Sequence, residues 1–250
     1  MPKFNRALVI VIAFLILMTL GIFAYLKYRP KDSVATDTTT QETVGTTTSA
    51  PETTVTETTQ TPEIPVTFSL KVPFIVQAPF ANWDARHEEA CEEASLLIVR
   101  YYRTGTPVAD LNAGDADISA LIDWEETHGY DVSITLRQLA QIAADFYGMK
   151  TSEIIINPTI DELKKEIANG HPIIVPAAGK LLNNPNFKNG GPNYHMLVIR
   201  GYDGANFITS DPGTRKGDGY VYPYDVLMSA IHDWDPENIT NGRKAVLVFD

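Results

Sequence analysis

The chain of 250 residues contains a single cysteine, Cys91, and five histidines. A lone cysteine with a distant histidine and a distant aspartate or asparagine is the pattern of a thiol nucleophile, its base and the group that orients the base. One cysteine also excludes an intramolecular disulfide and a metal site built on several thiolates. Taken alone, a free cysteine on the apolar face of a helix is more often a small core residue. The surrounding pattern must decide between these two interpretations.

Only one histidine, His195, lies in a pattern that also supplies a carboxylate. Residues 195–213, HMLVIRGYDGANFITSDPG, predict a β-hairpin with a three-residue turn at positions 203–205. This register places His195 opposite Gly213, with Asp211 on the same face and within side-chain reach. The carboxylate would fix the imidazole tautomer and stabilise the imidazolium. Taken singly, Asp211 is equally explained as a turn residue and His195 as an ordinary strand residue.

Apolar residues at helical spacing predict an amphipathic helix over residues 90–103, which places Cys91 in its first turn. The free N–H groups and the dipole of a helix N-terminus favour a thiolate there. Four neighbouring acids would instead raise the pKa of the thiol, so we expect a cation to offset them. These acids are Glu88, Glu89, Glu92 and Glu93.

Acyl transfer also needs donors aimed at the developing oxyanion. Gln77 follows a segment with a two-residue apolar period, residues 68–76, which predicts a strand. Its side-chain amide could supply one donor and the Cys91 N–H, at a helix start, the other. On its own, Gln77 is also an unremarkable polar residue at the boundary of an element.

The remaining elements predict the scaffold. Thr135 with Gln138 and Thr159 with Glu162 are capping-box pairs that open helices over 135–147 and 159–169. Short β-branched runs predict buried strands at 172–176, 195–202 and 245–249. Because helices come early and strands late, we predict an α+β domain with an antiparallel sheet packed on helices.

The N-terminal segment, residues 1–31, is predicted to be a membrane anchor. Residues 7–26 are uncharged and apolar, long enough as a helix to cross about 30 Å of hydrocarbon. Residues 27–30, KYRP, follow directly and offer no small-residue cleavage site, so we expect the segment to stay uncleaved. Basic residues flank the span on both sides and give no orientation.

A threonine-rich linker follows at residues 32–63, with fourteen threonines among the twenty-six residues 36–61. Such a segment has too few apolar residues to fold and resembles the stalks of surface proteins. We therefore expect a single-pass protein of the cell membrane, with residues 64–250 as an extracytoplasmic globular domain.

Charge and motifs exclude several classes of function. Residues 64–250 contain fifteen basic and twenty-five acidic residues and no lysine- or arginine-rich run, which argues against a nucleic-acid partner. No H-E-x-x-H pair is present, and we expect neither a metal ion nor a cofactor. The oligomeric state is left open.

Two blocks of the sequence resemble a known family. Residues 72–102, VPFIVQAPFANWDARHEEACEEASLLIVRYY, and residues 194–213, YHMLVIRGYDGANFITSDPG, look like the Gln-then-Cys and His-then-Asp blocks of the bacteriocin-processing (double-glycine) peptidases. These belong to the papain-like clan, with bacterial secreted or membrane-anchored relatives. The resemblance spans residues 72–225 and implies a papain-like fold and a thiol peptidase acting on peptides or proteins. Gln77, Cys91, His195 and Asp211 match the family's order.

Two features depart from the family pattern. Many members have glycine and proline after the cysteine, where this chain has Glu92 and Glu93, and this changes the charge beside the nucleophile. Fourteen positions separate Gln77 from Cys91, which suggests a longer loop that forms part of the substrate cleft. Four aromatic residues are further candidates for that cleft: Trp83, Trp124, Tyr194 and Tyr222.

The sequence predicts that Cys91 attacks the carbonyl and forms a thioester, while His195 carries the proton, Asp211 orients His195 and Gln77 binds the oxyanion. Two alternatives stay open. The same thiol chemistry could hydrolyse cell-wall peptides or side-chain amides, because substrate choice depends on cleft shape. The domain could also be an inactive relative that binds rather than cleaves.

Overall fold

The computed structural model describes residues 64–250, so the predicted membrane span 7–26 and the threonine-rich linker 32–63 lie outside the described residues. In the described part of the chain, no helix combines the length and apolar character that a membrane crossing needs. In residues 64–250, three of the five α-helices precede all strands but the first. The helices are η1 (His87–Glu89), α2 (Cys91–Thr104), α3 (Leu111–His128), α4 (Leu136–Tyr147), α5 (Ile160–Ala168), η2 (Gly179–Leu182), η3 (Lys188–Gly190), α6 (Tyr224–Ala230) and η4 (Ile239–Asn241).

The strands form one seven-stranded sheet in which every pair is antiparallel. They run in the order β2-β7-β3-β4-β5-β6, and β1 pairs with the end of β4. Their bounds are β1 (Thr67–Ser69), β2 (Ser152–Ile156), β3 (Ile173–Ala178), β4 (Tyr194–Asp203), β5 (Asn206–Ser210), β6 (Asp218–Pro223) and β7 (Ala245–Phe249). The predicted α+β class with an antiparallel sheet is confirmed.

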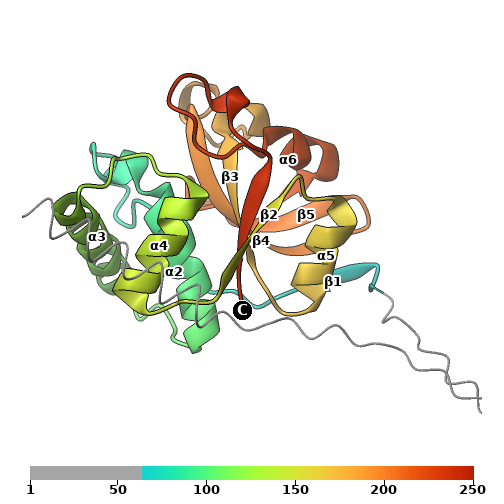
Figure 1. Ribbon diagram of the computed structural model, residues 1–250, viewed down its shortest axis with the longest axis horizontal. Coiled ribbons are helices and arrows are strands. Elements are labelled where there is room, and N and C mark those ends of the chain that lie inside the picture. The colour runs from blue at the N-terminus through green and yellow to red at the C-terminus, as the bar shows by residue number, and fades with distance from the viewer. Residues whose placement is uncertain (1–63) are drawn as a thin grey trace, which may run out of the picture. The chain divides into compact units, whose positions relative to one another are not determined.

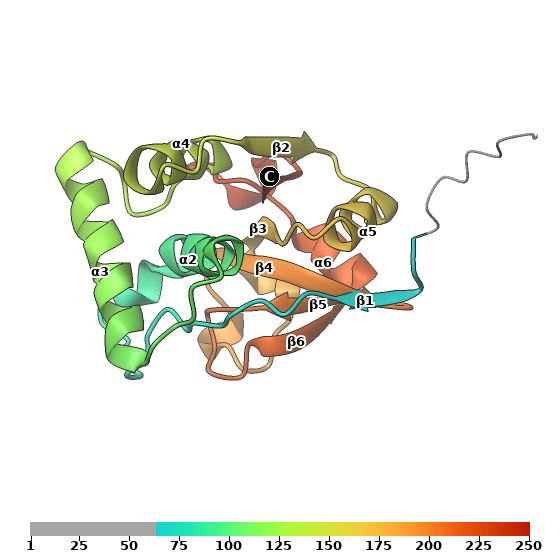
Figure 2. The ribbon, with the colours of Figure 1, turned by 90° about the horizontal axis from the view of Figure 1, so that it is seen from below.

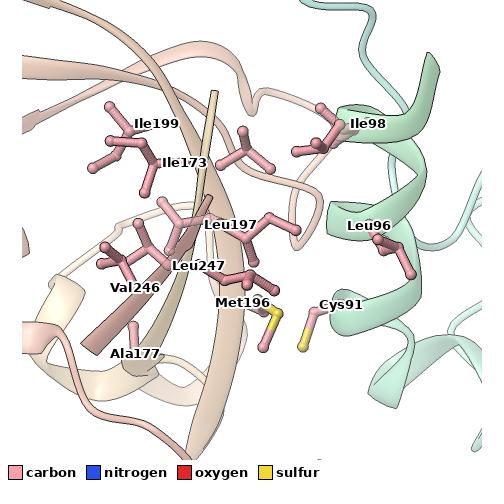
Figure 3. Packing of buried hydrophobic residues seen from close by; sticks show 14 of the residues in the cluster. Cys91, Leu96, Ile98, Ile173, Ala177, Met196, Leu197, Ile199, Val246 and Leu247 are labelled. Atoms are coloured by element: carbon pink, nitrogen blue, oxygen red, sulfur yellow. The ribbon is translucent and has the colours of Figure 1, made fainter. Parts of the chain in front are cut away.

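Helix α2 joins the helical part of the domain to the sheet. Figure 1 shows α2, α3 and α4 gathered beside the sheet, and Figure 2 shows α2 lying between α3 and β4. Its residues Leu96 and Ile98 are fully buried, as are the strand residues Leu197 and Leu247. Burying these side chains removes apolar surface from water, at roughly 1.5–3 kcal/mol for each fully buried one. This shared core holds the start of α2, and with it Cys91, against the first residues of β4 (Figure 3).

The predicted helix boundaries agree with the structure where capping residues mark them. Thr135 and Thr159 form complete capping boxes with Gln138 and Glu162, and α4 and α5 begin at the next residue. Each threonine hydroxyl accepts a free N–H of the first turn, which would otherwise lack a partner.

The hairpin turn is one residue shorter than predicted. Asp203 pairs with Asn206, so the turn contains Gly204 and Ala205 only. An irregularity between Ile199 and Gly201 then shifts the register by one residue and restores the predicted pairing farther along β4. Because a one-residue slip would turn every side chain to the other face, this bulge is what keeps His195 on the face of Asp211.

The predicted strand over residues 68–76 is wrong for most of its length. Strand β1 ends at Ser69, and the chain from Leu70 to Gln77 is irregular although much of it is buried. Pro73 lacks the N–H that a ladder needs. At the end of this segment, the Gln77 N–H donates a hydrogen bond to the Pro212 carbonyl, just after β5, at 3.0 Å.

Candidate active site

His195 and Asp211 form a buried ion pair at the start of β4. His195 Nε2 lies 2.8 Å from Asp211 Oδ1, and both residues are almost fully buried. Since Nε2 faces the carboxylate, the other ring nitrogen, Nδ1, is left for a second partner. The structure therefore brings together the two residues that the hairpin register predicted to be neighbours.

Three further groups hold the Asp211 carboxylate. The Gly213 N–H donates to Oδ1 at 3.0 Å, the Tyr222 hydroxyl donates to Oδ2 at 2.6 Å, and Asn184 Nδ2 donates to Oδ2 at 3.3 Å. Burial pushes the pKa of Asp211 upward, but the adjacent His195 and these donors outweigh it, and the pKa lies below its ordinary value. Asp211 is thus an anion at neutral pH.

Sequence reasoning missed Asn184 as part of this site. It precedes β4 in an irregular segment, and no motif links it to Asp211. Tyr222 was expected to line the cleft, but its hydroxyl instead bonds Asp211 and accepts from Asn184 Nδ2 at 2.7 Å. Trp124 does not line the cleft either. It stacks on His128, with ring centroids 3.9 Å apart.

Cys91 is the first residue of α2, as predicted. Figure 3 shows its sulfur beside Met196, the residue after His195 in β4, and the Met196 backbone N–H acts to lower the pKa of the Cys91 thiol. The start of α2 therefore meets β4 beside the histidine.

The thiol is not held as a thiolate. Cys91 Sγ donates to Glu92 Oε2 at 2.9 Å, and burial together with Glu92 and Glu93 raises the pKa of the thiol well above its ordinary value. These effects outweigh the helix N-terminus and the Met196 N–H, which favour the thiolate. The raised pKa agrees with the effect expected of the neighbouring acids, and the position of Cys91 at the start of α2 does not offset it.

The acids after Cys91 are offset by protonation more than by a cation. Glu92, Glu93 and Glu125 are all buried. Burial, chiefly, raises the pKa of Glu92 to about 8 and that of Glu125 to about 10. Arg86 lowers the pKa of Glu93, but burial dominates and the pKa stays above its ordinary value. At neutral pH most of this charge is absent.

Gln77 lines a cleft together with Cys91 and His195, but its side-chain amide already donates two hydrogen bonds to the backbone. Nε2 donates to the backbone carbonyls of His87 and Glu88 at 2.8 and 2.9 Å. Both donors are used on the segment that leads into α2, so Gln77 in this state fixes that segment and presents no donor to the cleft. An oxyanion role requires one of these bonds to exchange.

The cleft has a volume of about 690 Å³ and contains three of the four predicted site residues, Gln77, Cys91 and His195, in its lining. Asp211 lies behind His195, with no solvent exposure. Trp83 and Tyr194, two of the predicted aromatic candidates, also line the cleft. Segments far apart in the sequence therefore converge on one opening.

Comparison with known proteins identifies the family of this chain. A crystal structure of a candidate C39-like peptidase from Bacillus anthracis is 17% identical, with a TM-score of 0.49, and the similarity covers 74% of this chain and 97% of that chain. None of the curated proteins matches the chain. Residues 69–238 match the model of the Peptidase_C39 like family, and they include the cleft and both blocks of sequence that form it. Since this match takes in more than half of the chain, the protein belongs to the Peptidase_C39 like family.

Proposed function

We propose that the protein is a cysteine peptidase that hydrolyses peptide bonds with Cys91 as nucleophile. The buried His195–Asp211 pair carries the proposal, because His195 lines the same cleft of about 690 Å³ as Cys91, the single cysteine of the sequence. A histidine oriented by a carboxylate next to a thiol is the arrangement that nucleophilic acyl transfer needs.

In the proposed reaction, the thiol proton of Cys91 passes to Nδ1 of His195. The thiolate attacks the peptide carbonyl, and the C–N bond breaks as His195 returns the proton to the leaving amine. Water, activated by His195, then hydrolyses the thioester and releases the carboxylic acid. Asp211 keeps Nε2 protonated throughout and stabilises the imidazolium.

The resting site must reorganise before it can act. The thiol leaves Glu92 for His195, and Gln77 releases a backbone carbonyl to bind the oxyanion beside the Cys91 N–H. Catalytic hydrogen bonds that are poorly aligned without substrate often tighten when it binds.

We place this reaction outside the cell membrane. The apolar span 7–26 and the threonine-rich linker 32–63 support that placement. It is tested by adding protease to intact cells that express the full chain with a C-terminal tag. Removal of the tag without lysis supports the placement, and full protection of the tag contradicts it.

The peptidase is tested with the full-length chain and peptides whose products are identified by mass spectrometry. Wild-type protein should yield two peptide products, and Cys91→Ala and His195→Ala should lower the rate by at least about 10³-fold. Equal rates for wild type and Cys91→Ala would overturn the proposal. Release of products from cell-wall peptides but not from proteins would identify the amidase alternative.

A second candidate is an inactive binding module. The engaged amide of Gln77 and the bond from the thiol to Glu92 favour it, because neither is arranged for attack. The two candidates differ in the alkylation of Cys91 by iodoacetamide. In a peptidase the reaction should slow in His195→Ala, whereas an inactive module should show a thiol indifferent to His195.

A further inference from the structure

The wall of the cleft on the sheet side carries three cations. Lys188 belongs to η3, and Arg215 and Lys216 belong to the loop between β5 and β6; all three line the cleft. In the part of the chain that the structure describes, none of them lies within 4.0 Å of a carboxylate. By contrast, Arg200 and Arg243 pair with Asp218 and Asp233.

These cations run against the overall charge of the domain. Residues 64–250 have a net charge of −10, since they contain fifteen basic and twenty-five acidic residues. Acidic residues are present in the cleft too, but they come from the other side, where η1 supplies Glu88 and Glu89. A group of unpaired cations in a ligand cleft of an acidic protein attracts an anion to that place.

The loop of Arg215 and Lys216 is fixed relative to the proposed base. Its ends meet where the Asp211 N–H donates to the Gly217 carbonyl at 3.0 Å, and within it the Lys216 N–H donates to Thr214 Oγ1 at 3.2 Å. Gly213 packs so closely on His195 that an added Cβ would lie 2.7 Å from Cε1 of the ring. Both cations therefore follow directly after the contact with His195.

Lys188 approaches the same histidine from a different segment. The residue before it, Phe187, packs edge-on against the His195 ring, with centroids 5.2 Å apart and planes at 75°. Two separate segments therefore contact His195, one through Phe187 and one through Gly213. In each segment, the next exposed residue is a cation that lines the cleft.

The chemistry of acyl transfer says which part of a substrate meets these cations. His195 returns its proton to the leaving amine, so that amine lies within hydrogen-bond reach of His195. The carbonyl oxygen turns toward Gln77 and the start of α2. Residues that flank His195 therefore face the part of the peptide that follows the scissile bond.

We propose that the cleft selects substrates with a carboxylate shortly after the scissile bond, and that Lys188, Arg215 and Lys216 bind it. This inference rests on the proposed peptidase function. The carboxylate can come from an aspartate or glutamate side chain or from the free C-terminus of a short leaving peptide. The chemistry is the same in both cases.

The proposal is tested by digesting a library of natural peptides with the full-length chain and identifying the cleaved bonds by mass spectrometry. Aspartate, glutamate or a free C-terminus should be enriched in the first positions after the cleaved bond. Matched synthetic peptides then compare glutamate with glutamine at the enriched position, each with a free or an amidated C-terminus. The favoured carboxylate should raise kcat/KM by about three- to tenfold, and this gain should fall with added NaCl.

The double variant Arg215→Gln/Lys216→Gln should lose this gain, so that its kcat/KM values for the glutamate and glutamine peptides become nearly equal. Lys150→Gln, which removes an exposed cation just before β2, serves as the control and should keep the preference for the glutamate peptide. Cleavage with no preference between the matched peptides would overturn the charge selection and leave the peptidase intact.

A binding measurement separates failure of the two proposals. Two proteins are compared: Cys91→Ala, and Cys91→Ala combined with Arg215→Gln/Lys216→Gln. Each is titrated with fluorescent forms of the same peptides, and binding is followed by anisotropy. Tighter binding of the carboxylate peptide only with Arg215 and Lys216 present supports the selection even if the wild type cleaves nothing. Equal binding of both peptides overturns it.

Discussion

Two buried acidic residues, Asp211 and Glu92, have pKa values shifted in opposite directions. Asp211 receives donors from His195, Gly213, Tyr222 and Asn184 and stays charged although it is buried. Glu92, in the first turn of α2, accepts from the Cys91 thiol at 2.9 Å and weakly from the Ile134 N–H at 3.4 Å, and burial and Glu93 raise its pKa to about 8. Asp211 faces the His195 imidazole whereas Glu92 faces another acid, and this difference, together with the donors, decides which buried acid keeps its charge.

Asp211→Asn should lower kcat/KM by about 10²- to 10⁴-fold, because the amide no longer favours the tautomer with Nδ1 free. It should also change the pH dependence of stability. The folded pKa of Asp211 is depressed, so its contribution is present above the unfolded value of about 3.9 and is lost as the pH falls through the folded value. Thermal melts should show the variant less stable at pH 7, with a smaller difference at pH 3.

Glu92→Gln should lower the pKa of the Cys91 thiol. Above pH 8 the wild-type carboxylate is ionised and opposes the thiolate, and the amide removes that charge. The rate of iodoacetamide labelling at pH 9 should rise several-fold. Glu88→Gln, which changes an exposed acid before α2, is the control. Equal labelling of Glu92→Gln and wild type would show that burial alone sets the pKa.

Loop Asp211–Gly217 contacts His195 twice. It carries the Asp211 carboxylate that faces Nε2, and Gly213, which packs against the ring. Gly213→Ala should lower kcat/KM by roughly 10- to 100-fold, since the new methyl group would lie 2.7 Å from His195 Cε1 and must displace the ring. The melting temperature, measured beside activity, distinguishes a shifted histidine from an unfolded protein. Unchanged kinetics would mean that the loop yields at no cost.

The contact between α2 and α3 contains a carboxylic acid pair that should respond to pH. Burial and Glu93 raise the pKa of Glu125 to about 10, so its favourable contribution is complete below the unfolded value and is lost as the pH rises toward 10. Glu125→Gln should therefore resemble wild type at pH 5 and be more stable at pH 9. The gain in melting temperature should be about 2–4 °C for each kcal/mol. The neighbouring exposed variant Glu126→Gln should show no such trend.

How much the sequence predicts differs from element to element, for physical reasons. Capped helices are marked by local chemistry, so α4 and α5 are found correctly. Helix α3 has only a narrow buried stripe, Gly114, Ile118, Leu121 and Glu125, and its weak periodicity hides it. In the site, the spacing of the hairpin predicts that His195 meets Asp211. The resting contacts of Gln77 and Cys91 are not predictable, because they involve backbone carbonyls and a neighbouring acid that only the folded chain positions.

At the scale of the whole molecule, the predicted division of the chain near residue 64 can be tested directly. Glu-C protease should cut the threonine-rich linker after Glu63 or the earlier glutamates, since residues 32–63 contain no lysine or arginine for trypsin. The product should be a resistant fragment that begins near Ile64, because β1 pairs with β4 from Thr67 onward. Mass spectrometry of the fragment checks its start. A resistant fragment that begins well before residue 58 would extend the folded unit into the linker.

The separation of Cys91 and His195 along the chain has a consequence for biosynthesis. The two residues meet only because α2 packs on β4, and about a hundred residues lie between them. At translation rates of roughly 5–20 residues per second, the thiol emerges about 5–20 seconds before its base. During that interval Cys91 is an ordinary exposed thiol, harmless to the nascent chain but open to oxidants. The proposed peptidase would therefore become competent only when its sheet is complete.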